Sequence, residues 1–212
     1  MVERGAADGL FITTTGVGEI VVAHELGAAA VRDGDAVILS GSIGDHAVAI
    51  LAARGEFHFS AAVESDCAPL WDVVEAALTG AREVAGEEAI RFLRDPTRGG
   101  LTTVLAELAE ESGLGIEVAE DAIPVSPAVR SVCDLLGYDP LTLANEGKMV
   151  IVAAPEAADA VVAAVRETEH GREARRIGFV TAAHPGRVAL RTEFGTRRVL
   201  DMPVGELLPR IC

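Results

Sequence analysis

Short apolar runs alternate with segments of helical periodicity along most of this sequence. The run 36–40 is short and almost continuously apolar, which is typical of a strand buried on both faces of a sheet. A second apolar run, 149–153, also favours a strand. This alternation predicts an α/β or α+β fold in which helices pack on a mixed sheet.

Turn signals and periodicity set the bounds of the expected elements. Strands are expected at 10–15, 36–40, 89–93, 149–153, 175–181 and 187–192, with 197–200 pairing back across 193–196 as a hairpin. Helices are expected at 19–30, 45–53, 69–79, 101–113 and 155–165, and Cys133 is expected in the core on a further helix. Asp45 suits the N-cap of the helix at 45–53.

Composition excludes several classes of function. The chain has 212 residues, half of them hydrophobic, and a formal net charge of −15. This length and apolar content are enough for a hydrophobic core in one large domain, or in one domain and part of another. The acidic balance argues against nucleic acid as a partner, because phosphate binding depends on clustered Lys and Arg. No signal peptide or membrane-spanning run is present, so a soluble cytoplasmic protein is expected.

The three cysteines form an odd set, and neither they nor the histidines have the spacing of a metal site. This pattern favours a reducing compartment. Cys67 is expected to be a passive loop residue. Cys212 is the last residue, and because chain termini are usually exposed, its thiol is expected to swing between two reaction partners like a carrier arm. An accidental terminal cysteine is the alternative.

The segment 95–101, Asp-Pro-Thr-Arg-Gly-Gly-Leu, is the strongest internal motif. Gly99 and Gly100 precede a helix whose first N–H groups and dipole favour a phosphate or a carboxylate. Arg98 can add a bidentate contact, and Asp95 or Thr97 a cap or a supporting ligand. The alternative is a plain strand-to-helix turn in which Asp95 and Thr97 only cap the helix.

The segment 145–148, Asn-Glu-Gly-Lys, directly precedes an expected buried strand. Glu146 and Lys148 are therefore expected at the strand's edge, where loops hold functional groups. A partly desolvated Glu146 can act as a general base, and Lys148, the only lysine in the chain, can tune it or hold an anion. The alternative is a glycine turn flanked by a solvent-exposed ion pair.

His46 lies in a third glycine-bearing entry to a helix, 41–46. It can shuttle protons or bind phosphate there, and the alternative is an ordinary first-turn histidine.

These three elements, the motif at 95–101, the motif at 145–148 and the terminal Pro-Arg-Ile-Cys, together resemble the HypE family. HypE proteins are the carbamoyl dehydratases of [NiFe]-hydrogenase maturation, within the aminoimidazole-ribonucleotide-synthetase-like superfamily. The resemblance implies that 1–30 is the end of an N-terminal ATP-binding and dimerisation domain, and that 31–212 is a C-terminal synthetase-like domain with a mobile cysteine tail. The rest of the first domain, whose acidic residues hold Mg²⁺, has no match here.

The resemblance also implies a reaction. A HypF-type carbamoyltransferase loads a carboxamide onto Cys212, ATP activates it, and dehydration leaves a thiocyanate whose cyano group goes to iron on a HypC–HypD complex. Glu146 is then the expected base, Lys148 stabilises negative charge, and His46 is a further candidate in the same pocket. The expected nucleotide contacts are Asp95, Thr97, Arg98, Gly99, Gly100 and Asn145.

The resemblance further implies a homodimer in the full-length protein, and a fragment that is inactive alone. The alternatives are another ATP-dependent member of the superfamily, such as selenophosphate synthetase, and a non-catalytic carrier domain that only presents Cys212.

Overall fold

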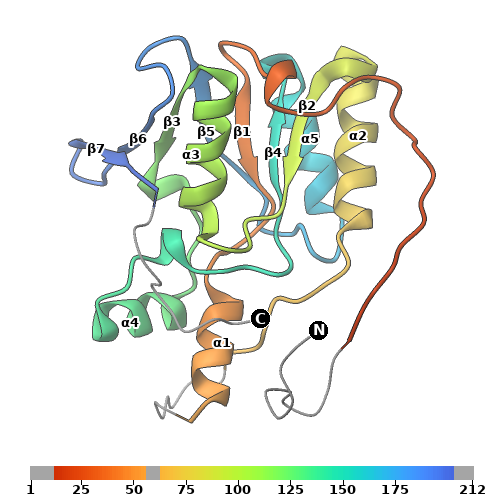
Figure 1. The fold of residues 1–212 in the computed structure, drawn as a ribbon. Coiled ribbons are helices and arrows are strands. Elements are labelled where there is room, and N and C mark those ends of the chain that lie inside the picture. Colours follow the sequence, from red (N-terminus) through yellow and green to blue (C-terminus); the bar gives the residue numbers. More distant parts are fainter. Residues whose placement is uncertain (1–11, 56–62, 203–212) are drawn as a thin grey trace, which may run out of the picture.

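Seven strands form one mixed sheet in the computed structural model, which describes residues 12–55 and 63–202 (Figure 1). The strand order is β2-β4-β1-β5-β3-β6-β7, and among these strands only β3 and β6 pair in parallel. The strands are β1 (Ala36–Leu39), β2 (Ile90–Arg94), β3 (Gly115–Ala119), β4 (Val150–Ala153), β5 (Arg175–Thr181), β6 (Val188–Arg191) and β7 (Arg197–Leu200). The predicted mixed sheet and the β6–β7 hairpin are confirmed.

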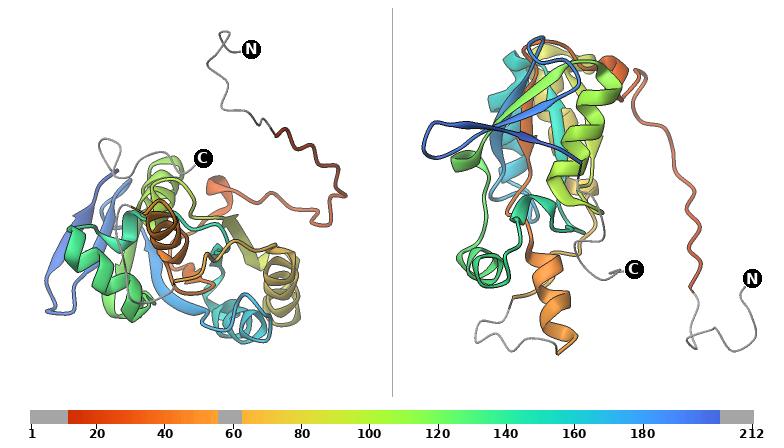
Figure 2. Two further views of the ribbon diagram at one scale, coloured as in Figure 1. Left: turned by 90° about the horizontal axis from the view of Figure 1, so that it is seen from below. Right: turned by 60° about the vertical axis from the view of Figure 1, so that its left-hand side comes forward.

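Helices cover both faces of this sheet (Figures 1 and 2). The α-helices are α1 (Asp45–Ala53), α2 (Trp71–Ala85), α3 (Gly100–Ser112), α4 (Pro127–Leu136) and α5 (Ala158–Arg166). Val37 of β1 lies in the apolar cluster that α3 covers, whereas its neighbour Ile38 lies in the cluster under α2 and α5. The continuously apolar run therefore is a strand buried on both faces, as predicted.

Strand register brings three chain segments to one edge of the sheet. Val150, the first residue of β4, is the register partner of Leu39, the last residue of β1, and also of Arg94, the last residue of β2. The segments that follow β1, follow β2 and precede β4 therefore emerge side by side.

α1 and α4 lie below the sheet in the view of Figure 1 and share a separate small core. Val48 of α1 packs there with Val129 and Cys133 of α4. Burial raises the pKa of the Cys133 thiol to about 11, so this sulfur stays protonated at neutral pH. The predicted core position of Cys133 is confirmed.

The segment before β1 differs from the prediction. Within residues 12–30 the only regular element is a short 3₁₀ helix, Ala28–Ala30, so the predicted helix at 19–30 is wrong. Residues 12–15 of the predicted strand at 10–15 are not in a strand either. Residues 12–21 are exposed, and an isolated amphipathic segment of this length has no surface on which to bury its apolar side.

Two further details differ from the prediction. Gly44, in a left-handed conformation, is the N-cap of α1, and Asp45 is the first helical residue. Strand β3 is missed by the sequence pattern, because its apolar alternation (Ile116, Val118) is short and begins three residues after Gly113, the glycine that ends α3. No helix in the described ranges is long and apolar enough to cross a membrane.

Gly100, the first residue of α3, and Gly113, its C-cap, provide a matched pair for a stability test. Both have a left-handed φ, +62° and +69°, but a Cβ on Gly100 would lie 2.5 Å from the Leu143 carbonyl oxygen, whereas the space beside Gly113 is open. Gly113→Ala is expected to cost about 1 kcal/mol for its backbone conformation, and Gly100→Ala about 2 kcal/mol more because of overpacking. Urea unfolding of both variants measures the difference, and equal losses would contradict the close packing of 141–143 on α3.

Candidate active site

The buried side chain of Asn145 connects the three loops at this edge of the sheet. Its Oδ1 accepts the backbone N–H of Gly44 at 2.7 Å, and its Nδ2 donates to the carbonyl oxygens of Pro96 at 3.0 Å and Leu143 at 2.9 Å. Asn145 is fully buried. The motifs at 41–46, 95–101 and 145–148, far apart in the sequence, are therefore joined at one point.

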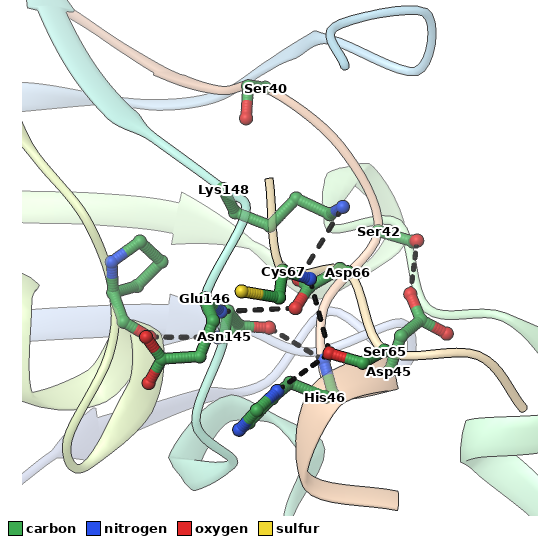
Figure 3. Close-up of polar contacts among 12 residues, drawn as sticks. Ser40, Ser42, Asp45, His46, Ser65, Asp66, Cys67, Asn145, Glu146 and Lys148 are labelled. Carbon is green, nitrogen blue, oxygen red and sulfur yellow. Dashed lines mark hydrogen bonds and ion pairs between the residues drawn. The ribbon is translucent and has the colours of Figure 1, made fainter. Parts of the chain in front are cut away.

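The first loop joins β1 to α1. Ser42 Oγ donates to Asp45 Oδ2 at 2.7 Å, and Ser126 Oγ, from the N-cap of α4, donates to Asp45 Oδ1 at 3.2 Å (Figure 3 shows the first of these). Asp45 thus connects the starts of α1 and α4 instead of capping its own helix.

The second loop joins β2 to α3 and leaves the start of that helix without a side-chain cap. Gly99 is the N-cap, and no side chain caps it. The alternative in which Asp95 and Thr97 cap the helix is therefore wrong. The Thr97 carbonyl accepts the Gly100 N–H at 3.0 Å, which closes the turn, and Asp95 and Arg98 are exposed. An uncapped helix start preceded by a glycine has the chemistry of an anion site.

The third loop, 145–148, leads into β4. Glu146 is half-buried, and its backbone N–H donates to Asp66 Oδ1 at 3.0 Å. Lys148 Nζ lies 3.5 Å from Asp66 Oδ2, and only 13% of the Lys148 side chain is exposed. The alternative of a solvent-exposed ion pair is wrong, because the partner of Lys148 is a buried carboxylate.

Ser40 fixes the junction of this loop with the sheet. The Met149 N–H donates to Ser40 Oγ at 2.9 Å, and the Ser40 N–H donates to the Met149 carbonyl at 3.0 Å. Two hydrogen bonds between Ser40 and Met149 thus hold the start of β4 beside the end of β1.

His46 lies in the first turn of α1, and its Nδ1 is 2.9 Å from Ser65 Oγ. This contact connects α1 to the segment 63–70, which precedes α2 (Figure 3). Its proposed part in proton transfer stays a prediction.

A pocket of about 310 Å³ opens beside Lys148. Cys67 lies at its wall and is exposed, in contrast to the buried Cys133. The lining residues come from four parts of the chain: Gly41, Ser42, Ser65, Asp66, Cys67, Ala68, Lys148, Glu169, His170, Arg172 and Glu173. This pocket places a lysine and an exposed thiol in one cavity.

The structure brings most of the predicted residues together but not all of them. Two of the predicted loops meet at Asn145: the loop that contains Asp95, Thr97, Arg98, Gly99 and Gly100, and the loop that contains Glu146 and Lys148. The side chain of Asn145 itself forms its hydrogen bonds with backbone groups of the protein. A contact of Asn145 with a nucleotide stays a prediction, and Cys212 lies outside the described residues. Sequence reasoning missed Asp66, since a single acid in an irregular loop carries no pattern.

The chain is similar to known proteins over its whole length. Residues 32–191 match the family model described as AIR synthase related protein, C-terminal domain. Carbamoyl dehydratase HypE of Bradyrhizobium diazoefficiens is 50% identical over 212 residues, which is all of this chain and 60% of that protein. The chain thus spans about 60% of the length of the curated relative.

Two solved structures extend the likeness to the fold. A crystal structure of the hydrogenase maturation protein HypE in complex with ATP matches with a TM-score of 0.81 at 45% identity, covering 92% of this chain and 58% of that chain. A HypE–HypF complex matches with a TM-score of 0.77 at 40% identity, covering 83% and 55%. The chain therefore belongs to the family of AIR synthase related proteins through their C-terminal domain, and it is similar to the C-terminal part of the carbamoyl dehydratase HypE, as the three motifs predicted.

Proposed function

We propose that this chain is the C-terminal part of a hydrogenase maturation enzyme of the HypE type, which dehydrates a carbamoyl group on Cys212 to a thiocyanate. The observation that carries this proposal is the meeting of three loops at Asn145, which brings an uncapped helix start to the same edge of the sheet as Glu146 and Lys148. A phosphate site, a base and a cation are what an ATP-driven dehydration needs.

The proposed chemistry has three steps. A carbamoyltransferase transfers the carboxamide from an activated carbamoyl donor to Cys212 Sγ, so the bond from the carbamoyl carbon to the donor's leaving group breaks and the thiol loses its proton. ATP then transfers its terminal phosphoryl group to the carboxamide oxygen, which releases ADP and one of the two nitrogen protons and makes this oxygen a good leaving group. Removal of the proton from nitrogen and cleavage of the carbon–oxygen bond release phosphate and leave S–C≡N on Cys212. The product serves as the source of the cyanide ligand of the [NiFe] centre.

Each residue type suits its proposed role. Glu146 is half-buried at the start of the loop that leads into β4, and a carboxylate can act as the general base that takes a proton from nitrogen. Lys148 is mostly buried, and its ammonium can offset negative charge on the oxygen that leaves. Arg98 is exposed beside the start of α3, where it can meet the phosphates.

Magnesium does not fit the described residues. No group of three or more His, Cys, Asp or Glu among them is arranged to hold a metal ion. We assign Mg²⁺, most contacts with ATP and homodimer formation to the part of the relatives' length that this chain does not match.

Partners follow from the same proposal. A solved HypE–HypF complex supports a HypF-type carbamoyltransferase as the donor of the carbamoyl group. The acceptor of the cyano group is proposed to be a HypC–HypD complex in the cytoplasm.

Replacement of the terminal thiol is the first test. The test uses the full-length protein, in which this chain is joined to the N-terminal domain. After incubation with the carbamoyltransferase, carbamoyl phosphate and ATP, Cys212→Ala is expected to carry no carboxamide. Intact mass spectrometry measures this loading. Cys67→Ser is the matched control, because Cys67 is the exposed thiol at the pocket and should leave loading unchanged. Loading of the Cys212→Ala protein would exclude Cys212 as the acceptor.

Glu146→Gln separates loading from dehydration. The amide keeps the shape and the backbone hydrogen bond to Asp66 but cannot act as a base, so the variant should carry the carboxamide and not lose water from it. The dehydration rate is expected to fall by about 10²- to 10⁴-fold. A loaded variant that dehydrates at the wild-type rate would remove Glu146 from the role of base.

A further inference from the structure

Asp66 contacts all three residues that follow Asn145. Its Oδ1 accepts the backbone N–H of Glu146 at 3.0 Å, and its Oδ2 lies 3.5 Å from Lys148 Nζ (Figure 3). Its carbonyl oxygen lies so near Gly147 that a Cβ there would be 1.6 Å away. One residue of a loop about 80 positions earlier in the sequence thus fixes this whole turn.

The Asp66–Lys148 pair is buried, unlike most ion pairs in the described part of the chain. The Asp66 side chain is 3% exposed and the Lys148 side chain 13%. Asp66 Oδ2 has no hydrogen-bond partner within the described structure, so the ammonium of Lys148 is its main compensation. A buried charge without its partner is strongly unfavourable, and hence each group holds the other in place.

The stem of Lys148 is also confined. It lies against Gly41, where a Cβ would come within 3.3 Å of both Cδ and Cε. The glycine beneath the stem and the carboxylate at the head together leave the ammonium at the wall of the pocket. Since an ammonium has three donors, those not directed at Asp66 remain for a bound anion.

The loop that carries Asp66 is itself anchored. Ser65 Oγ accepts the Cys67 N–H at 3.2 Å and pairs with His46 Nδ1 at 2.9 Å. The carboxylate of Asp66 therefore stands between α1 and the start of β4.

We propose that Asp66 is a positioning residue of the dehydration site, which sets the places of Glu146 and Lys148 at the same time. The inference rests on the proposed function, because it assigns Asp66 to the reaction of these two residues. Asp66 touches no reacting atom in this scheme, and it acts through the backbone of Glu146 and the ammonium of Lys148.

Asp66→Asn tests this role in the full-length protein. The amide keeps the size of the side chain and an oxygen for the Glu146 N–H, but it removes the charge that holds Lys148. Loading by the carbamoyltransferase is expected to be unchanged. The single-turnover dehydration rate should fall by about 10- to 100-fold, as for a small misplacement of reacting groups, with the KM for ATP within about threefold of wild type.

Asp72→Asn is the matched control. Asp72 lies six residues further along the chain, in the first turn of α2, and accepts the N–H of Val73. Its replacement should leave the dehydration rate within about twofold of wild type, as expected for a residue remote from Glu146 and Lys148.

A double-mutant cycle with Lys148→Gln distinguishes positioning from a general loss of structure. If Asp66 acts through Lys148, adding Asp66→Asn to Lys148→Gln should slow dehydration much less than it does in the wild type. The double variant also leaves no unpaired buried charge, so it remains informative if Asp66→Asn alone folds poorly.

The outcomes separate the two claims. A loaded Asp66→Asn protein that dehydrates within twofold of wild type, or a double variant whose loss is the product of the single losses, would overturn the positioning role alone. A wild-type protein that is never loaded would overturn the proposed function and the positioning role with it.

Discussion

The site depends on the burial of one amide side chain. Asn145 is the only asparagine in the chain, and it bonds to backbone groups of three different loops. Each such hydrogen bond adds only about 1 kcal/mol net, but each buried group left without its partner costs about 1–3 kcal/mol. The loops are therefore mutually dependent, since displacing one leaves polar groups of the others unpaired in the interior.

The strand register of the sheet determines where the three loops can meet. Because Val150 pairs with both Leu39 and Arg94, the ends of β1 and β2 and the start of β4 lie at one edge. A slip of one residue in either pairing would turn the apolar side chains of β4 to the wrong faces, so the packing of α3 on one side and of α2 and α5 on the other keeps the register. The same register then presents Glu146 and Lys148 beside Asp66, whose carboxylate balances the buried ammonium.

Local pattern predicted much of this arrangement. The apolar run 36–40, the strand at 175–181 and the glycine pair at the start of α3 are predicted correctly, because burial on both faces, alternation and an open helix start are properties of a few adjacent residues. The segment 19–30 was misread, since its periodicity suits a helix but the described chain provides no surface for it to pack on. Asp66 was missed for a related reason: its role comes from a contact with residues 80 positions away, which spacing within one segment does not reveal.

Amide hydrogen exchange of Asn145→Ala tests most directly whether one side chain holds the three loops together. The account predicts that protection falls together at the Gly44 N–H, in the loop 95–100 and at 145–149, while the strands β1 and β5 keep theirs. A loss confined to 145–149, with the Gly44 N–H and the loop 95–100 as protected as in the wild type, would contradict it.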